Sequence, residues 1–155
     1  MILLEDTRQQ AGKHKNLDSY FKRTGVQVER CALYVGDYAF ANDMRRAVDT
    51  KSGVMELMMD MHQDHERFAA ECERAQRAGI GLLILIEEVL PEGGLAAWEA
   101  PKNRFGQSLT KASPETLRRA LHTMTAKYGV RFRFCSPNST GRHIIEYLTE
   151  GVLPP

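Results

Sequence analysis

Two aspartates and a lysine in the first third of the chain have the types and spacing needed for phosphate chemistry. Asp37 follows Gly36, whereas Asp49 and Lys51 are separated by one residue in a strand-like segment. Residues two apart on a strand point to the same face, so Asp49 and Lys51 are expected to share a face. If residues 26–51 form a hairpin, Asp37 can lie beside them. The pattern therefore predicts two carboxylates and one ammonium group in one place.

This combination of groups suits metal-dependent hydrolysis of a phosphodiester. Two carboxylates can hold Mg²⁺ or Mn²⁺ and leave positions open for a phosphate oxygen and a water molecule. The cation offsets charge on the phosphoryl group and makes its bound water easier to deprotonate. A neighbouring lysine can orient or deprotonate that water, or stabilise the oxyanion. The bare pattern has a second interpretation, because charged pairs are also common on exposed strand edges.

The hydrophobic pattern places these residues among alternating strands and helices. Apolar runs or alternation predict strands at residues 2–4, 26–35, 47–51, 82–86 and 130–134, the second with a bulge or bend. Helices are expected at residues 14–24, 54–75 and 114–128, with a final one starting at Thr140 or Gly141. Residues 91–110 have loop composition around one helical turn at 95–98. We expect one α/β domain over residues 1–155, with a central mixed sheet flanked by helices.

Composition narrows the class of protein. The chain has 155 residues, 43% hydrophobic and 26% charged, which is typical of a globular domain. Its longest apolar run, residues 79–86, is too short to span a bilayer, so no membrane association is expected. The three cysteines are far apart and lack CxxC spacing, which argues against a disulfide framework or a zinc ribbon. These features predict an intracellular, cytoplasmic protein, nucleoid-associated if it is bacterial or phage-derived.

Positive charge is concentrated in the last third of the chain. Residues 101–155 contain nine basic and three acidic side chains, although the whole chain has a net charge of only +1. A basic region beside an acidic metal site suits DNA, and a solvated charged face is the competing interpretation. Four arginines of this region are candidate phosphate contacts: Arg118, Arg119, Arg131 and Arg133.

Three short segments follow one another in the first third of the chain, each in or next to an expected strand. They are Glu5-Asp6-Thr7-Arg8-Gln9 after an apolar strand, Val35-Gly36-Asp37-Tyr38, and Val48-Asp49-Thr50-Lys51-Ser52. In this order they resemble the motifs of the XPF-type nuclease domain family of the PD-(D/E)XK superfamily. The family motifs are D–x–R–E, V–G–D–Y and V–E–R–K–S, and Leu83-Ile84-Leu85-Ile86-Glu87 resembles the family's later L–L–I–E strand. The match covers about residues 1–90. It implies a restriction-endonuclease-like core for the whole chain.

The resemblance also implies roles for individual residues. Asp37, Asp49 and the backbone carbonyl of Thr50 would bind Mg²⁺ or Mn²⁺, and Lys51 would be catalytic. Asp6 would stand at the edge of the site as a further catalytic residue. Arg8 and Arg67 would contact substrate, with Glu71 at a position where the family usually has glutamine.

Some positions depart from the family motifs and leave the ligand set open. Asp49 replaces a glutamate, Thr50 replaces an arginine, and Gln9 replaces the glutamate of the first motif. The acidic residue expected four positions after the lysine is Met55, with Glu56 one place later. Whether Glu56 or Glu71 joins the site therefore stays open.

The resemblance implies a metal-dependent endonuclease acting on DNA, with branched or flap structures among the candidate substrates. Larger family members carry a tandem helix-hairpin-helix module, for which these 155 residues have no room. A homodimer or a partner subunit would then assist DNA binding. Two alternatives stay open: an enzyme resembling a Holliday-junction resolvase, and a catalytically inactive nuclease fold that serves as a DNA-binding scaffold.

Other potential sites favour structural interpretations. His62 and His65 have HxxH spacing, but His65 falls on the apolar stripe and is expected to be partly buried. Trp98 is expected to pack in the core. The same is expected of a group of methionines, namely Met55, Met58, Met59 and Met61.

Overall fold

A mixed six-stranded sheet forms the centre of the protein. The computed structural model describes residues 1–9 and 15–151. In chain order the strands are β1 (Ile2–Asp6), β2 (Gln27–Cys31), β3 (Tyr38–Phe40), β4 (Asp43–Lys51), β5 (Gly81–Ile86) and β6 (Arg131–Phe134). Their spatial order is β2-β1-β3-β4-β5-β6. The pairs β1–β2, β4–β5 and β5–β6 are parallel, whereas β3 is antiparallel to both β1 and β4.

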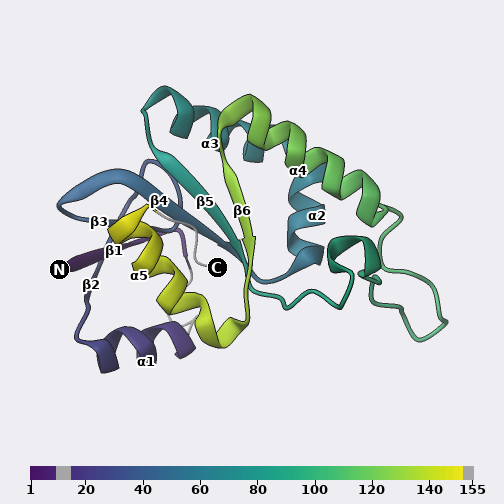
Figure 1. The fold of residues 1–155 in the computed structure, drawn as a ribbon, viewed down its shortest axis with the longest axis horizontal. Coiled ribbons are helices and arrows are strands. Elements are labelled where there is room, and N and C mark those ends of the chain that lie inside the picture. Colours follow the sequence, from purple (N-terminus) through teal and green to yellow (C-terminus); the bar gives the residue numbers. More distant parts are fainter. Residues whose placement is uncertain (10–14, 152–155) are drawn as a thin grey trace.

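Helices cover both faces of this sheet (Figure 1). The α-helices are α1 (Lys15–Thr24), α2 (Val54–His62), α3 (His65–Arg77), α4 (Pro114–Tyr128) and α5 (Thr140–Glu150). Two short 3-10 turns are η1 (Gly94–Ala97) and η2 (Pro137–Ser139). One hydrophobic core lies under α2, α3 and α4, and a second lies under α1 and α5. The predicted fold class, an α/β domain with a mixed sheet flanked by helices, is confirmed.

Strands β4 and β5 show how the two cores determine the direction of the side chains that matter for function. Alternate residues of β5 enter opposite cores, which explains why this strand is apolar throughout. In β4, Ala47 packs under α2 and α3, and Val48 packs under α1 and α5. Asp49 therefore points to the α2–α3 face, like Ala47, because side chains alternate along a strand. This alternation directs Asp49 toward the helices that follow β4.

The observed hairpin is shorter than the predicted one. Strands β3 and β4 pair across a turn at Ala41-Asn42, whereas β2 ends at Cys31 and pairs in parallel with β1. The prediction of one strand over residues 26–35 and one hairpin over residues 26–51 was therefore wrong. The phase change at Cys31, interpreted as a bulge, marks the end of the strand. A loop over residues 32–37 then crosses to the strand on the other side of β1.

The predicted single helix over residues 54–75 is two helices, α2 and α3. The carbonyl of Met59 accepts hydrogen bonds from the amides of both Gln63 and Asp64, at 2.8 and 3.2 Å, and the helix stops there. The break changes the helical phase, so His65 is exposed in the first turn of α3 instead of partly buried. Met59 is 46% exposed and is not part of the core. The expectation for His65 was wrong because it assumed a continuous helical face. The expectation for Met59 was wrong because this residue lies outside the buried positions of α2, which are Val54, Leu57, Met58 and Met61.

Other local predictions agree with the structure. Ser113 caps α4 by accepting a hydrogen bond from the amide of Thr116, and Gly129 ends the helix with a positive φ of 71°. Trp98 is buried, as expected. The helix expected over residues 14–24 is α1, and residue 14 lies outside the described residues. Within residues 1–9 and 15–151, no helix has the length and apolar character needed to cross a membrane.

Candidate active site

The backbone of Asp37 connects β1 to β4. Its amide donates to the carbonyl of Val48 at 2.8 Å, and its carbonyl accepts from the amide of Asp6 at 2.8 Å. Gly36, just before it, has a positive φ of 75°, and a Cβ there would lie 3.0 Å from the Val48 carbonyl oxygen. The tight turn at Gly36 thus places Asp37 between β1 and β4, two strands that are far apart in the sequence.

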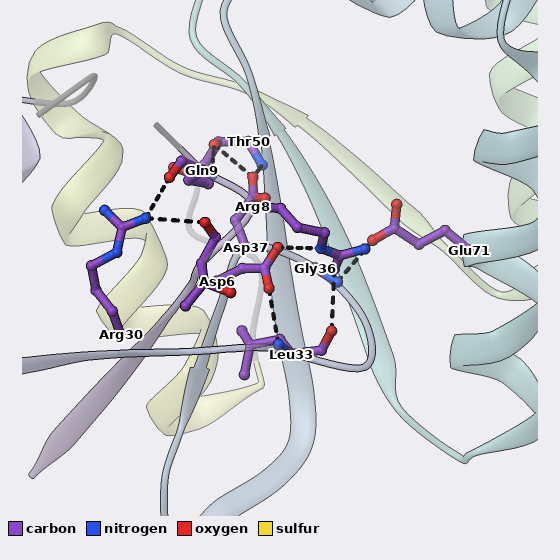
Figure 2. Close-up of polar contacts among 10 residues, drawn as sticks. Asp6, Arg8, Gln9, Arg30, Leu33, Gly36, Asp37, Thr50 and Glu71 are labelled. Carbon is purple, nitrogen blue, oxygen red and sulfur yellow. Dashed lines mark hydrogen bonds and ion pairs between the residues drawn. The ribbon is translucent and has the colours of Figure 1, made fainter. Parts of the chain in front are cut away.

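The side chain of Asp37 points toward the end of β4 (Figure 2). Its Oδ2 atom accepts hydrogen bonds from the backbone amide of Thr50 at 2.8 Å and from the Thr50 hydroxyl at 2.9 Å. Gln9 Nε2 lies 3.4 Å from the same hydroxyl. Thr50 therefore fixes the orientation of the Asp37 carboxylate beside Asp49 and Lys51.

Lys51 lies between two carboxylates. Its Nζ atom is 2.8 Å from Asp49 Oδ2 and 2.8 Å from Asp60 Oδ2 on α2. The same ammonium lies 5.5 Å from the centroid of the Phe68 ring on α3. Asp49 is 6% exposed, so Lys51 and its partners form a nearly buried charge cluster between β4 and the two helices.

Burial and neighbouring charge shift the pKa values in this cluster. Burial raises the pKa of Asp49 well above its ordinary value, and the nearby Asp37 carboxylate raises it further, although Lys51 opposes both effects. Burial lowers the pKa of Lys51, but the attraction to Asp49 and Asp60 is larger, so its pKa is raised. Lys51 is therefore a stable ammonium group. Burial also raises the pKa of Cys72 to about 12, so this nearby thiol stays protonated.

Asp6 holds the loop that leads to Asp37. One of its oxygens, Oδ1, accepts from the amide of Leu33 at 2.9 Å, and Oδ2 pairs with Arg8 Nε at 2.5 Å (Figure 2). Arg8 Nη2 also donates to the carbonyl of Leu33 at 3.1 Å. The bond to Asp6 raises the pKa of Arg8. Both oxygens of Asp6 are thus occupied by the protein itself, and Arg8 is held at the edge of the site.

A contact from α3 holds the same loop from its other side. Glu71 Oε1 accepts a hydrogen bond from the amide of Gly36 at 2.8 Å. In Figure 2, Glu71 reaches from its helix toward Gly36, next to Asp37. Glu71 is therefore a positioning residue for the Asp37 loop, and it also faces the cavity described next.

One cavity of about 470 Å³ collects most of the predicted site residues. Its lining residues are Asp6, Arg8, Gln9, Asp37, Asp49, Thr50, Lys51, Glu56, Arg67, Glu71 and Arg74. They come from the end of β1 and the turn after it, the end of β4, the loop before β3 and the two helices α2 and α3. The fold therefore brings together the three motifs, of which the first (Asp6) and the last (Asp49) are more than forty positions apart in the sequence.

The four candidate arginines of the last third of the chain lie outside this cavity. Arg118 and Arg119 extend from α4 and pair with Glu115 at 2.8 and 3.3 Å. Arg131 lines two other cavities, one with Arg46 and Gly81, where the parallel pairing of β4 and β5 begins, and one with Arg118. Arg133 is partly buried and acts electrostatically on the buried His143. None of these four arginines therefore lines the cavity that contains Asp37.

Two members of the site were not predicted. Asp60 is the second partner of Lys51, and Arg74 lines the cavity from α3. A signal for Asp60 was present, because this acidic residue lies between Leu57 and Met61, which are buried positions of an amphipathic helix. Arg74 carried no such signal, since a basic residue near a helix C-terminus is ordinary.

The donor set is compatible with a cation, although no complete ligand cluster is preformed. Among the described residues, no three His, Cys, Asp or Glu side chains are arranged to hold a metal ion. Asp49 Oδ2 is buried without a well-aligned hydrogen bond and has only the ion pair with Lys51. Two carboxylates that raise each other's energy in one cavity suit a divalent cation, which would relieve that repulsion.

Comparisons with known proteins agree with this geometry. A family model described as the ERCC4 domain matches residues 6–147, which is most of the chain. The chain belongs to the ERCC4 domain family. The predicted resemblance to XPF-type nuclease domains is thereby confirmed. No curated protein sequence matches the chain significantly.

Solved structures show the same fold. XPF from Aeropyrum pernix superposes with a TM-score of 0.68 at 16% identity, over 97% of this chain and 65% of that chain. The complex of XPF from Aeropyrum pernix with DNA gives a TM-score of 0.66 at 18% identity, over 99% of this chain and 68% of that chain. This ERCC4-family chain thus spans about two thirds of the length of the proteins in these structures.

Proposed function

We propose that this protein is a metal-dependent endonuclease that hydrolyses phosphodiester bonds of DNA. The observation that carries the proposal is the convergence of Asp37, Asp49 and Lys51 on one cavity in an ERCC4-family fold. Paired carboxylates with a lysine suit phosphoryl chemistry, and a protein that only bound DNA would gain nothing from two carboxylates that repel phosphate.

In this proposal, Asp37, Asp49 and the backbone carbonyl of Thr50 hold Mg²⁺ or Mn²⁺. A bound cation supplies charge neutralisation at the scissile phosphate and a more acidic water. Thr50 also orients Asp37 through its amide and hydroxyl, which keeps the carboxylate directed into the cavity. Asp49 approaches from the neighbouring position on β4.

Lys51 supplies positive charge to the oxyanion that develops on the phosphate. Asp60 holds the Lys51 ammonium from the side of α2, so the lysine keeps a partner when Asp49 binds a cation. Arg8, Arg67 and Arg74 line the cavity and would contact flanking phosphates. Asp6 acts as a positioning residue, because it holds Arg8 and the loop before Asp37.

The proposed substrates are branched or flap DNAs, with four-way junctions as a second geometry. An open cavity lined by three arginines can accept a backbone without enclosing a small molecule. The similar XPF of Aeropyrum pernix has been seen in complex with DNA, which supports DNA as the polymer.

The test is single-turnover cleavage of a flap, a four-way junction, a plain duplex and a single strand, each with Mg²⁺, Mn²⁺ or EDTA. We expect the wild-type protein to cut at least one branched DNA with a divalent cation and none with EDTA. Asp37→Asn should be inactive, and Asp43→Asn, which changes a carboxylate outside the cavity, should keep activity. A wild-type protein that binds these DNAs and cuts none would replace this proposal with the DNA-binding scaffold.

A further inference from the structure

Tyr34 is an exposed aromatic residue next to the candidate active site. It is 61% exposed, although its neighbours Leu33 and Val35 are both buried. It lies three positions before Asp37 in the loop between β2 and β3. A single exposed aromatic residue is ordinary on a protein surface, so its exposure alone carries no function. Two further features distinguish Tyr34: the hydrogen bonds that hold its loop, and its contact with an arginine of the cavity.

The loop that carries Tyr34 is held at both ends by side chains of the site. Asp6 accepts from the Leu33 amide at 2.9 Å, and Arg8 donates to the Leu33 carbonyl at 3.1 Å. Glu71 accepts from the Gly36 amide at 2.8 Å (Figure 2). The backbone on both sides of Tyr34 is therefore fixed to β1 and α3, and the ring has a defined place before any ligand binds.

A second feature connects the Tyr34 ring to the cavity. The guanidinium carbon of Arg74 lies 5.9 Å from the ring centroid, in a cation–π contact. Arg74 itself lines the cavity that contains Asp37, Asp49 and Lys51. Arg74 thus contacts the exposed Tyr34 ring and also lines the cavity where a phosphate is proposed to bind. A nucleotide presents the same two groups, a phosphate and a flat base, at neighbouring places.

We propose that Tyr34, held against Arg74, is a stacking site for an unpaired nucleobase of the strand whose backbone enters the cavity. The inference rests on the proposed function, and it names the part of the substrate that this chain distinguishes. A paired base inside a duplex is covered on both faces by its neighbours, whereas an unpaired base has a face free for a protein ring. The site therefore selects DNA with unpaired nucleotides beside the scissile phosphate.

The test measures binding without cleavage, in EDTA, to a flap DNA and to a fully paired duplex of the same length. Tyr34→Ala should weaken flap binding by roughly 10-fold, the scale of one lost base–aromatic stack, and leave duplex binding nearly unchanged. Tyr34→Phe should bind like the wild type, because the ring is kept. Phe105→Ala is the matched control. Phe105 is 72% exposed under Arg104, 4.8 Å from its guanidinium carbon, and does not line the cavity.

A crosslinking experiment locates the contact directly. Flap DNA with 5-iodouracil at successive unpaired positions should crosslink to a peptide containing Tyr34 at one or two positions. The same base analogue within the duplex arm should give no crosslink to that peptide. Equal loss of flap and duplex binding in Tyr34→Ala, no loss of either, or crosslinks to Phe105 in place of Tyr34 would each overturn the proposal.

The outcome is separable from that of the proposed function. Flap-selective loss in Tyr34→Ala would support the stacking site even if the wild-type protein cut no DNA. Metal-dependent cleavage by a wild-type protein whose Tyr34→Ala variant binds flap DNA normally would leave the nuclease assignment intact and remove the stacking site.

Discussion

Lys51 contacts both Asp49 and Asp60, so its positive charge serves the folded protein as well as the proposed chemistry. Without a cation, it is the nearest compensation for the buried Asp49 carboxylate. With a cation on Asp49, Asp60 still holds the ammonium beside the cavity. The same side chain can therefore stabilise the site before metal binding and stabilise the oxyanion after it.

Lys51→Ala should lower the single-turnover cleavage rate by about 10²–10⁴-fold, the scale of a positioned acid–base or oxyanion-stabilising group. DNA affinity should change little, because this lysine acts on the transition state. Lys127→Ala is the matched control, since this exposed lysine lies 5.2 Å from the Tyr128 ring centroid, outside the cavity. Cleavage by Lys51→Ala at the wild-type rate would place the active site elsewhere. Circular dichroism would verify that each variant is folded.

Asp49→Asn should separate metal binding from folding. A cation that binds only the folded protein raises its melting temperature, and this rise depends on the ligand charge that the variant lacks. We expect Mn²⁺ to raise the melting temperature of the wild-type protein and of Asp43→Asn, and to leave that of Asp49→Asn unchanged. Equal shifts in all three proteins would remove Asp49 from the ligand set. The measurement is a thermal melt with Mn²⁺ and with EDTA, and it needs no DNA.

The raised pKa of Asp49 has a consequence for stability without metal. A carboxyl whose pKa is raised by folding contributes stability below its ordinary pKa of 3.8 and loses it as the pH rises through the raised value. Rising pH should therefore destabilise the metal-free wild-type protein more than Asp49→Asn. Urea denaturation in EDTA at several pH values measures this difference. If the free energy of unfolding changed with pH equally in both proteins, ionisation of Asp49 would not destabilise the fold.

Single-residue predictions succeeded where the relation between residues is local. Asp49 and Lys51 share a face because a strand alternates with period two, and no distant contact is needed to know it. Asp60 could not be assigned to Lys51 in this way. Its direction depends on how α2 packs against the end of β4, and sequence spacing alone does not determine that packing.

At the level of elements, α3 provides more than a wall for the cavity, because Glu71 ties it to the loop that carries Asp37. Glu71→Ala should remove the acceptor for the Gly36 amide and lower cleavage by roughly 10-fold or more, since small misplacements of a ligand cost much. Glu71→Gln should stay close to the wild type, because glutamine keeps the Oε1 acceptor. The contrast between the two variants is the measurement. A large loss in Glu71→Gln would mean that the negative charge matters.

The glutamine usual in the family at the position of Glu71 is consistent with this view. Glutamate and glutamine share the acceptor oxygen that the loop uses, so the difference in charge need not disturb the loop. The sequence comparison alone left open whether Glu71 joins the site. The structure shows that it lines the cavity and bonds to the backbone of Gly36.

Helix and strand boundaries were the least predictable elements. The hydrophobic steps from Val54 to Ala75 are compatible with one helix, and only the double hydrogen bond to the Met59 carbonyl reveals two. Likewise, residues 26–35 were predicted as one strand, although β2 ends at Cys31 and the loop over residues 32–37, with its tight turn at Gly36, crosses to β3. The hydrophobic pattern of a segment predicts its local conformation. The strand with which it pairs depends on residues far away in the sequence, so the pattern does not predict that partner.

At the scale of the whole molecule, regional charge did not predict which arginines line the cavity. The surplus of basic residues after position 100 suggested one DNA-binding wall, but none of the four candidate arginines of this region lines the cavity that contains Asp37. The arginines that line the cavity come instead from the turn after β1 (Arg8) and from α3 (Arg67 and Arg74), in parts of the chain with little net positive charge. Position in the fold, and not regional composition, thus decides which arginines line the cavity.

Salt dependence of DNA binding tests this distribution. Each lost phosphate contact reduces the slope of log affinity against log salt by about one. We expect Arg67→Ala to show this reduction, because Arg67 lines the cavity, and the double variant Arg118→Ala/Arg119→Ala to keep the wild-type slope. A reduced slope in the double variant alone would move the DNA path onto α4. Titrations of labelled flap DNA at several salt concentrations measure both.

The turn at Gly36 restricts how this chain can vary. A side chain there would need a left-handed backbone and would meet the Val48 carbonyl oxygen at 3.0 Å and the Ala47 Cβ at 3.1 Å. In a library with every amino acid at this position, selection for activity should return glycine alone. Gly106 has a similar φ of 76° but open space around it, so its library should recover some asparagine and aspartate. Among the sequences that survive selection, position 36 should thus be invariant and position 106 should vary.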